Sequence, residues 1–362
     1  ITVQKAYETL QRDGFIETTI GRGSFVSARN KEFYQEEQQR IAEEHLQIAA
    51  EIGRTNHISL SKLQELLTLF YTNNMDYALK LQNVCKQYDA SDFMLNHVTF
   101  ALPSGAIMGF VGENGAGKTT TIGCILNTLK KDSGLIEIFG KEMKDKDIQI
   151  RENIGVVYDG DNFPGYLTAR QISDIMAGIY QQWDVSLFER YLEKFQLKSN
   201  QKISKYSKGM TMKLAVAAAL SHHPQLLILD EATSGLDPIM REEILDLFLE
   251  FVEDEKHSIL LSSHITSDLE RIADYITFIH KGKIILTELK DTLIYNYAVL
   301  RCTEKVFSSL DNEDILAYRR KDYQIDILVS DIEKARKKYP NVIIDHTTID
   351  EIMLLLVKGE QI

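Results

Sequence analysis

A glycine-rich stretch carries the clearest chemistry in the sequence. It consists of Gly112, Glu113, Asn114, Gly115, Ala116, Gly117, Lys118, Thr119 and Thr120. The apolar run 106–111 precedes it and the run 121–126 follows it, an order that predicts a buried strand, a tight loop and a helix. Glycines let successive backbone N–H groups turn toward phosphate oxygens, and a helix N-terminus adds positive potential. The stretch therefore predicts a phosphate cradle, with Lys118 reaching the β- and γ-phosphates and the Thr119 hydroxyl binding Mg²⁺.

A second apolar run ends in two acids. Residues 226–229 lead directly into Asp230 and Glu231. A buried parallel strand delivers the residues that follow it to the carboxyl edge of the sheet, beside the phosphate loop. We therefore expect Asp230 in the Mg²⁺ shell and Glu231 beside the water that attacks the γ-phosphate.

Three further stretches, together with these two, resemble the motifs of ABC-type nucleotide-binding domains. Residues 232–238 resemble the D-loop, 263–264 the switch that follows a strand, and 206–210 (Tyr-Ser-Lys-Gly-Met) the family's signature. The five motifs stand in the family's order and cover about residues 76–290. The Ser-Lys-Gly-Met signature is similar to that of ABC-2-type bacterial exporters. The resemblance therefore implies the ATPase subunit of such an exporter.

The resemblance also implies roles for single residues. His264 would contact the γ-phosphate and help to position Glu231 and the water. Tyr88, between two predicted strands, would stack on the adenine ring, although a packed turn tyrosine is the alternative. Ser207 and the Gly209 N–H would bind the γ-phosphate held by the opposite subunit, which requires a head-to-tail pair.

Two motifs depart from the family's pattern. In the signature, Lys208 replaces the first glycine of Leu-Ser-Gly-Gly-Gln, and Met210 replaces the glutamine. At the Q-loop the expected glutamine falls on Asp159, directly after the predicted strand 154–158. An acid can still meet Mg²⁺ or water, but it adds a charge. We expect these departures to affect the catalytic rate more than the fold.

The predicted fold class is α/β. Residues 75–290 form a P-loop NTPase domain with an ABC-type antiparallel β subdomain and an α-helical subdomain at 167–205. The apolar residues on the first helix of that subdomain are either core or part of a groove for a membrane partner. Residues 291–362 predict a small α/β cap without a catalytic cluster.

The first 74 residues resemble part of a different family. Residues 1–30 are similar to the recognition helix and wing of a GntR-type winged helix-turn-helix regulator, with a helix ending at Gly14 and two short strands within 17–26. Its two preceding helices are absent, so the fragment is not expected to fold alone. Residues 31–74 predict helical dimerisation or linker segments. For residues 1–30, an ordinary helix and hairpin are the alternative. Met75 resembles a natural start, which suggests that two reading frames are joined there.

Net charge, cysteine content and the lengths of the apolar runs argue against several classes of protein. The formal net charge is −12, which argues against a general nucleic-acid or anionic-membrane binder. Three scattered cysteines suggest no disulfide framework and fit a reducing cytoplasm. No apolar run approaches the ~18 residues of a membrane span. We expect a cytoplasmic protein held at the inner face of the membrane by its partners.

The predicted function is that of an ATP-binding subunit, with ATP and Mg²⁺ as cofactors. It would work as a homodimer or paired subunit that drives export through separate integral membrane permeases. One alternative is an ATP-gated GntR-type regulator, with DNA binding by residues 1–30. Another is a soluble ABC protein acting on ribosomes or DNA, although such chains usually carry two cassettes or a coiled-coil insertion.

Overall fold

The computed structural model describes most of the chain in two compact units, 1–74 and 75–362. The described residues are 16–19, 23–26, 46, 49–50, 53–55, 58–64, 77–88, 93–144, 147–160, 162–321 and 323–360. The division falls at the position where the sequence analysis ended the N-terminal segments. The identities assigned to the domains stay predictions.

The first unit contains one described sheet. Strands β1 (Ile16–Thr19) and β2 (Gly23–Val26) pair antiparallel, with Ile16 opposite Val26. The two predicted strands are therefore present, while the predicted helix before Gly14 lies outside the described residues. Within 31–74, the described residues 60–64 and several shorter pieces are helical.

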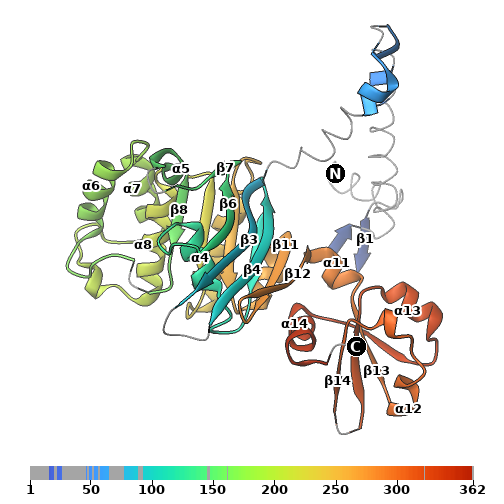
Figure 1. Cartoon of the computed structure of the whole chain (residues 1–362). Helices are drawn as coiled ribbons and strands as arrows, with labels where there is room; N and C mark the ends of the chain where they lie inside the picture. The colour runs from blue at the N-terminus through green and yellow to red at the C-terminus, as the bar shows by residue number, and fades with distance from the viewer. Residues whose placement is uncertain are drawn as a thin grey trace, which may run out of the picture. The chain divides into compact units, whose positions relative to one another are not determined.

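A six-stranded sheet forms the centre of the second unit (Figure 1). Its order is β12-β11-β5-β10-β9-β8, and all neighbours are parallel except β11 and β12. The strands are β5 (Ile107–Val111), β8 (Ile154–Val157), β9 (Leu226–Asp230), β10 (Ser258–Ser263), β11 (Tyr275–His280) and β12 (Lys283–Leu289). Every residue of β5, β9 and β10 is buried, because both faces of these strands are covered. This burial explains their continuous apolar runs.

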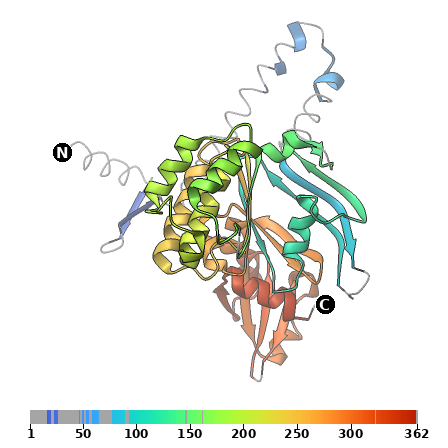
Figure 2. The ribbon, with the colours of Figure 1, turned by 90° about the vertical axis from the view of Figure 1, so that its left-hand side faces the viewer.

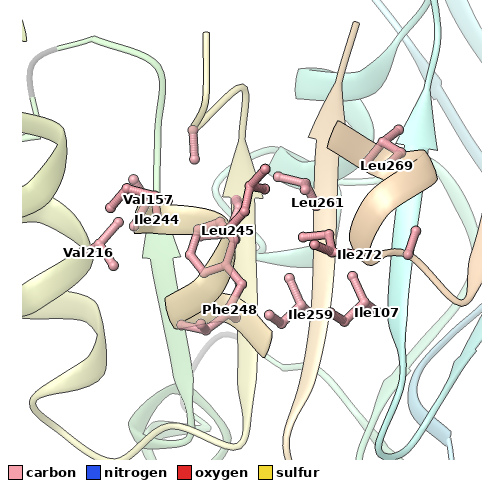
Figure 3. Close-up of a cluster of buried hydrophobic side chains, with 14 of the residues drawn as sticks. Ile107, Val157, Val216, Ile244, Leu245, Phe248, Ile259, Leu261, Leu269 and Ile272 are labelled. Carbon is pink, nitrogen blue, oxygen red and sulfur yellow. The ribbon is translucent and has the colours of Figure 1, made fainter. Parts of the chain in front are cut away.

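One face of this sheet packs on two helices that lead away from the predicted site. Helix α9 (Pro238–Phe251) and α10 (Thr266–Ile272) place Leu245, Phe248 and Ile272 against the sheet (Figure 3). Burying each such side chain stabilises the fold by about 1.5–3 kcal/mol. Asp237 caps α9 by accepting hydrogen bonds from two backbone N–H groups, as its place directly before Pro238 at the helix start leads one to expect.

The predicted antiparallel β subdomain is confirmed. Strands β3 (Tyr77–Gln87), β4 (Met94–Pro103), β6 (Ser133–Ile138) and β7 (Lys141–Glu142) form a sheet in the order β4-β3-β6-β7. Its buried residues share a hydrophobic cluster with β5 and with α4 (Lys118–Ile125). This packing fixes the helix that follows the glycine-rich loop.

The predicted helical subdomain at 167–205 contains α6 (Ala169–Ile179) and α7 (Val185–Lys194). Helix α8 (Lys208–Leu220) follows it and shares its hydrophobic cluster, and the short α5 (Ile148–Glu152) precedes β8. Of the apolar residues on the first helix, Ile172 is buried in the core, whereas Ile175 and Ile179 are exposed. The groove for a membrane partner stays a prediction. Among the described residues, no helix combines the length and apolar character needed to cross a bilayer.

The C-terminal residues form an antiparallel sheet in the order β14-β15-β13-β16, which in both views lies below the core sheet (Figure 2). The elements are α11 (Lys290–Tyr295), β13 (Ala298–Cys302), α12 (Glu304–Phe307), β14 (Ala317–Arg320), β15 (Ile325–Val329), α13 (Ile332–Lys338), β16 (Ile343–His346) and α14 (Ile349–Lys358). From the sequence, residues 297–302, 323–329 and 341–344 predict strands and residues 332–338 and 349–357 predict helices, which correspond to β13, β15, β16, α13 and α14. The helices α11 and α12 and the strand β14 were not predicted. The α14 residues Ile349 and Ile352 join the core cluster that includes α10.

Candidate nucleotide site

The glycine-rich loop connects β5 to α4, as predicted. Gly117 has φ +115°, a left-handed conformation that suits glycine. A Cβ on Gly112 would lie 2.5 Å from the Ile279 carbonyl oxygen, so only glycine fits this close approach. The buried Lys118 side chain folds back over the loop, and its Nζ donates to the Gly112 carbonyl oxygen at 2.7 Å. The loop therefore encloses a cation at the start of a helix.

Asp230 ends β9 and is held by two hydroxyl groups. Its Oδ2 accepts a hydrogen bond from Thr119 Oγ1 at 2.9 Å, and its Oδ1 accepts one from Ser262 Oγ at 2.7 Å. Thr119 and Asp230, both predicted as Mg²⁺ ligands, are thus brought together. Ser262, which was not predicted as a site residue, is Asp230's direct neighbour in the β9–β10 register. That register was the signal that could have located it.

Glu231 links the loop lysine to the histidine after β10. Its Oε1 lies 3.2 Å from Lys118 Nζ, and its Oε2 lies 2.5 Å from His264 Nδ1. Glu231 has φ +54°, a conformation that costs about 1–2 kcal/mol for a side-chain-bearing residue. The buried Oε1 takes part in the ion pair with Lys118 but accepts no hydrogen bond among the described residues, so a movement of Lys118 would open an acceptor position beside the phosphate loop. Glu231 therefore contacts both of the other residues predicted to be catalytic.

A cavity of about 590 Å³ lies over the loop. It is lined by Phe93, Glu113, Asn114, Gly115, Gly117, Lys118, Thr119, Thr120, Tyr158, Asp159, Asp230 and Glu231. A larger cavity of about 970 Å³, between β7 and α5, is lined by none of the predicted site residues. The smaller cavity is the candidate site because the predicted chemistry faces it.

Two aromatic side chains line this cavity, those of Phe93 and Tyr158, and neither was predicted as a site residue. The Phe93 ring lies against the loop, since a Cβ on Gly117 would be 2.9 Å from its Cζ. Tyr88 is not among the lining residues; its ring centroid lies 5.8 Å from Lys86 Nζ. Stacking of Tyr88 on adenine stays a prediction.

The signature residues lie at the N-terminus of α8, outside this cavity. Ser207 is the N-cap, and its Oγ accepts a hydrogen bond from the Met210 N–H at 3.2 Å. Neither Ser207 nor Gly209 lines the cavity in the same chain. The two departures from the family's pattern do meet, because Lys208 Nζ lies 3.2 Å from Asp159 Oδ1.

The residues around Asp230 fit Mg²⁺. Mg²⁺ prefers oxygen ligands, keeps several waters and usually takes one or two protein groups besides substrate phosphates. Thr119 Oγ1 and Asp230 Oδ2 supply a hydroxyl and a carboxylate 2.9 Å apart at the cavity wall. Within the described part of the chain, no group of three or more His, Cys, Asp or Glu could hold a metal by itself. A metal here would therefore bind together with phosphate.

Comparison with known proteins agrees with this site. The family described as "ABC transporter" matches residues 95–234. A bacitracin transport ATP-binding protein of Bacillus licheniformis is 38% identical over 213 residues, which cover 58% of this chain and 69% of that protein. A lantibiotic transport ATP-binding protein of Streptococcus pyogenes is 35% identical over 218 residues, which cover 59% of this chain and 91% of that protein.

Solved structures show the same fold. An ATP-binding subunit of an ABC transporter is 28% identical, has a TM-score of 0.54, and aligns over 60% of this chain and 91% of that one. A dimeric ATP-binding cassette bound to ADP and Pi is 22% identical, with a TM-score of 0.53 over 59% of this chain and 98% of that one. At that identity the second likeness shows the fold alone.

The chain belongs to the ATP-binding proteins of ABC transporters. It is an ATP-hydrolysing subunit of such a transporter, and the alternative of an ATP-gated regulator is not favoured.

Proposed function

We propose that two copies bind Mg²⁺-ATP head to tail, and that closing of the pair drives export through separate membrane subunits. One observation carries this proposal: the cavity of a single chain contains Lys118 and Glu231 but lacks the signature residues Ser207 and Gly209. Ser207 lies at the N-terminus of the 13-residue helix α8, where backbone N–H groups favour an anion. A second copy facing the first would supply this helix end to the bound triphosphate.

The loop lysine would act by exchanging partners. Lys118 Nζ lies between the Gly112 carbonyl oxygen and Glu231 Oε1. A triphosphate in the cavity offers the ammonium group a more highly charged partner, so Lys118 would turn toward the β- and γ-phosphates. This movement would release Glu231 Oε1 to accept a hydrogen bond from water.

Glu231 would then orient the attacking water and accept its proton. His264 would hold the Glu231 carboxylate in place through the contact at Nδ1. Thr119 and Asp230 would hold Mg²⁺, which when bound offsets charge on the phosphates. The Ser262 hydroxyl donates a hydrogen bond to Asp230 Oδ1. This bond would fix the orientation of the carboxylate, so that Asp230 Oδ2 points toward the Mg²⁺ position.

A small groove near the Q-loop is the proposed docking place for a membrane subunit. It has a volume of about 170 Å³ and is lined by Val156, Tyr158, Asn162, Phe163, Met176, Tyr180, Ala215, Ala218, Ala219 and His222. Its walls are largely apolar and aromatic, a composition that suits a short amphipathic helix. Docking there would hold this subunit at the inner face of the membrane.

The direction of transport and the substrate class rest on similarity. The signature resembles that of ABC-2-type exporters, and two relatives carry the names bacitracin and lantibiotic transport ATP-binding proteins. We therefore propose export of a peptide antibiotic. The first 74 residues are proposed to derive from a GntR-type regulator, supported by the antiparallel β1–β2 pair at the predicted wing.

The export proposal is tested in membrane vesicles. The chain is co-expressed with a candidate multi-span membrane subunit chosen from the neighbouring genes, and ATP-dependent movement of labelled bacitracin and of a labelled lantibiotic is measured. We expect accumulation inside inverted vesicles with the wild-type chain and none with Glu231→Gln. Peptide movement in the opposite direction, or none with either peptide, would contradict the proposed export.

A further inference from the structure

Two residues that depart from the family's pattern form an ion pair. Asp159 lies two residues after β8, and Lys208 is the first residue of α8. They are 49 positions apart in sequence, yet Asp159 Oδ1 and Lys208 Nζ are 3.2 Å apart. The lysine also lies beside the D-loop, since a Cβ on Gly235 would be 3.0 Å from Lys208 Nζ. The pair thus joins the Q-loop to the signature helix within one chain.

The cavity has an excess of negatively charged side chains, and the ion pair offsets one of these charges. Four carboxylates line the cavity, those of Glu113, Asp159, Asp230 and Glu231, whereas Lys118 is the one cationic side chain among the lining residues. ATP adds several negative charges to this already acidic surface. Each uncompensated carboxylate near the phosphates would therefore weaken ATP binding by like-charge repulsion.

The other carboxylates have partners of their own. Glu231 contacts Lys118 and His264, and Asp230 accepts hydrogen bonds from two hydroxyl groups. Glu113 Oε1 lies 3.8 Å from Lys358 Nζ. For Asp159, the ion pair found among the described residues is the one with Lys208.

We propose that Lys208 is a positioning residue for the Q-loop, which offsets the Asp159 charge beside the triphosphate and holds that carboxylate at the cavity edge. The lysine in the signature and the acid in the Q-loop then act as one unit. Removing the lysine alone leaves an acid facing the phosphates, whereas removing both charges leaves the site neutral at that edge.

The test is a double-mutant cycle with neutral side chains of similar size. Lys208→Met is expected to raise the Kd for ATP about threefold, a size typical of half-exposed ion pairs. Asp159→Asn should not raise it, and the double variant Asp159→Asn/Lys208→Met should return close to the wild-type Kd. Binding of a fluorescent ATP analogue is measured in EDTA as well as in Mg²⁺, so that the result does not depend on turnover.

The control is an ion pair of similar exposure that lies outside the cavity. Lys194 Nζ and Glu250 Oε2 are 3.0 Å apart and join α7 to α9. The cycle with Lys194→Met and Glu250→Gln should leave the Kd for ATP unchanged. The Lys208 effect should also shrink at high salt, because salt screens half-exposed charges.

Several outcomes would overturn the proposal. If Lys208→Met weakens binding equally whether residue 159 is Asp or Asn, the lysine acts directly on the nucleotide and not through Asp159. If Lys208→Met leaves the Kd for ATP unchanged at low salt, the lysine does not offset the charge of Asp159. ATP binding is established for this family. Either result would therefore disprove the positioning role of Lys208 and would leave the head-to-tail proposal unaffected.

Discussion

The nucleotide site and the C-terminal domain use the same residue types in opposite ways. At the site, Lys118 and Glu231 face a cavity, and Glu231 keeps one oxygen without a hydrogen-bond partner among the described residues. In the C-terminal domain, Asp314 is enclosed by Lys334 and Lys338, each with its Nζ 2.6 Å from a carboxylate oxygen. The first arrangement has room for a ligand to replace a partner, whereas the second is complete within the chain.

The electrostatics of Asp314 agree with a structural role. Hydrogen bonds from Lys334 and Lys338 hold the pKa of the Asp314 carboxyl well below its usual range, and the Tyr339 hydroxyl donates a third at 2.8 Å. A carboxylate satisfied in this way stabilises the fold and is not available for chemistry. Charged clusters therefore indicate function only where a cavity leaves their partners exchangeable.

The largest expected effect is on turnover. Glu231→Gln should lower the ATPase rate at least about hundredfold, because the amide cannot accept the proton of water. ATP should still bind and should trap a dimer, measured by phosphate release and light scattering. Glu250→Gln on α9 is the matched control and should keep normal turnover. Near-normal turnover of Glu231→Gln would remove Glu231 as the general base.

The next effect is on affinity. Lys118→Ala should weaken ATP binding about 10- to 100-fold, because it removes a charge-assisted hydrogen bond to phosphate. Equilibrium binding of labelled ATP measures the loss, with Lys194→Ala as the control. Unchanged binding would place Lys118 outside the working site.

The C-terminal cluster gives a stability effect. Asp314→Asn should lower the free energy of unfolding by about 1–2 kcal/mol, because two lysines lose a carboxylate, while the Kd for ATP stays unchanged. The folded-state pKa of Asp314 is depressed, so its stabilisation is present above the ordinary Asp pKa of about 4 and is lost as pH falls below it. Urea unfolding from pH 7 to pH 3 should therefore show the difference between wild type and variant shrinking. A constant difference, or a change in ATP binding, would contradict the division drawn between the two regions.

The smallest effect concerns the adenine. Tyr88→Ala should raise the Kd for ATP by about two- to tenfold if its ring stacks on the base. Tyr323→Ala, on a fully exposed side chain of the C-terminal domain, is the control. If Phe93→Ala weakens binding and Tyr88→Ala does not, the stacking role passes to Phe93.

Much of the site was predictable because its motifs are local. A glycine loop between a strand and a helix, or two acids after a buried strand, can be recognised from neighbouring residues alone. Ser262 was missed because its place beside Asp230 depends on strand register. The contact between Asp159 and Lys208 depends on how the helical subdomain folds back, which no local pattern encodes.

The C-terminal domain was predictable only in outline. Its longer apolar strands and helices were predicted, but β14 was missed because Ala-Tyr-Arg-Arg is short and half charged. Its pairing with β15 supplies the stability that local propensity lacks. The Asp314 cluster likewise joins residues twenty or more positions apart.

The head-to-tail site is tested most directly by pairing two defective copies. One copy carries Lys118→Ala and the other Ser207→Arg, both in a Glu231→Gln background, and mixed dimers are isolated through different tags. Both defects fall in one shared site, so the other site keeps an intact Lys118 and an intact Ser207. The account predicts one occluded ATP in each mixed dimer and none in dimers of either copy alone. Mixed dimers that occlude no ATP would contradict it.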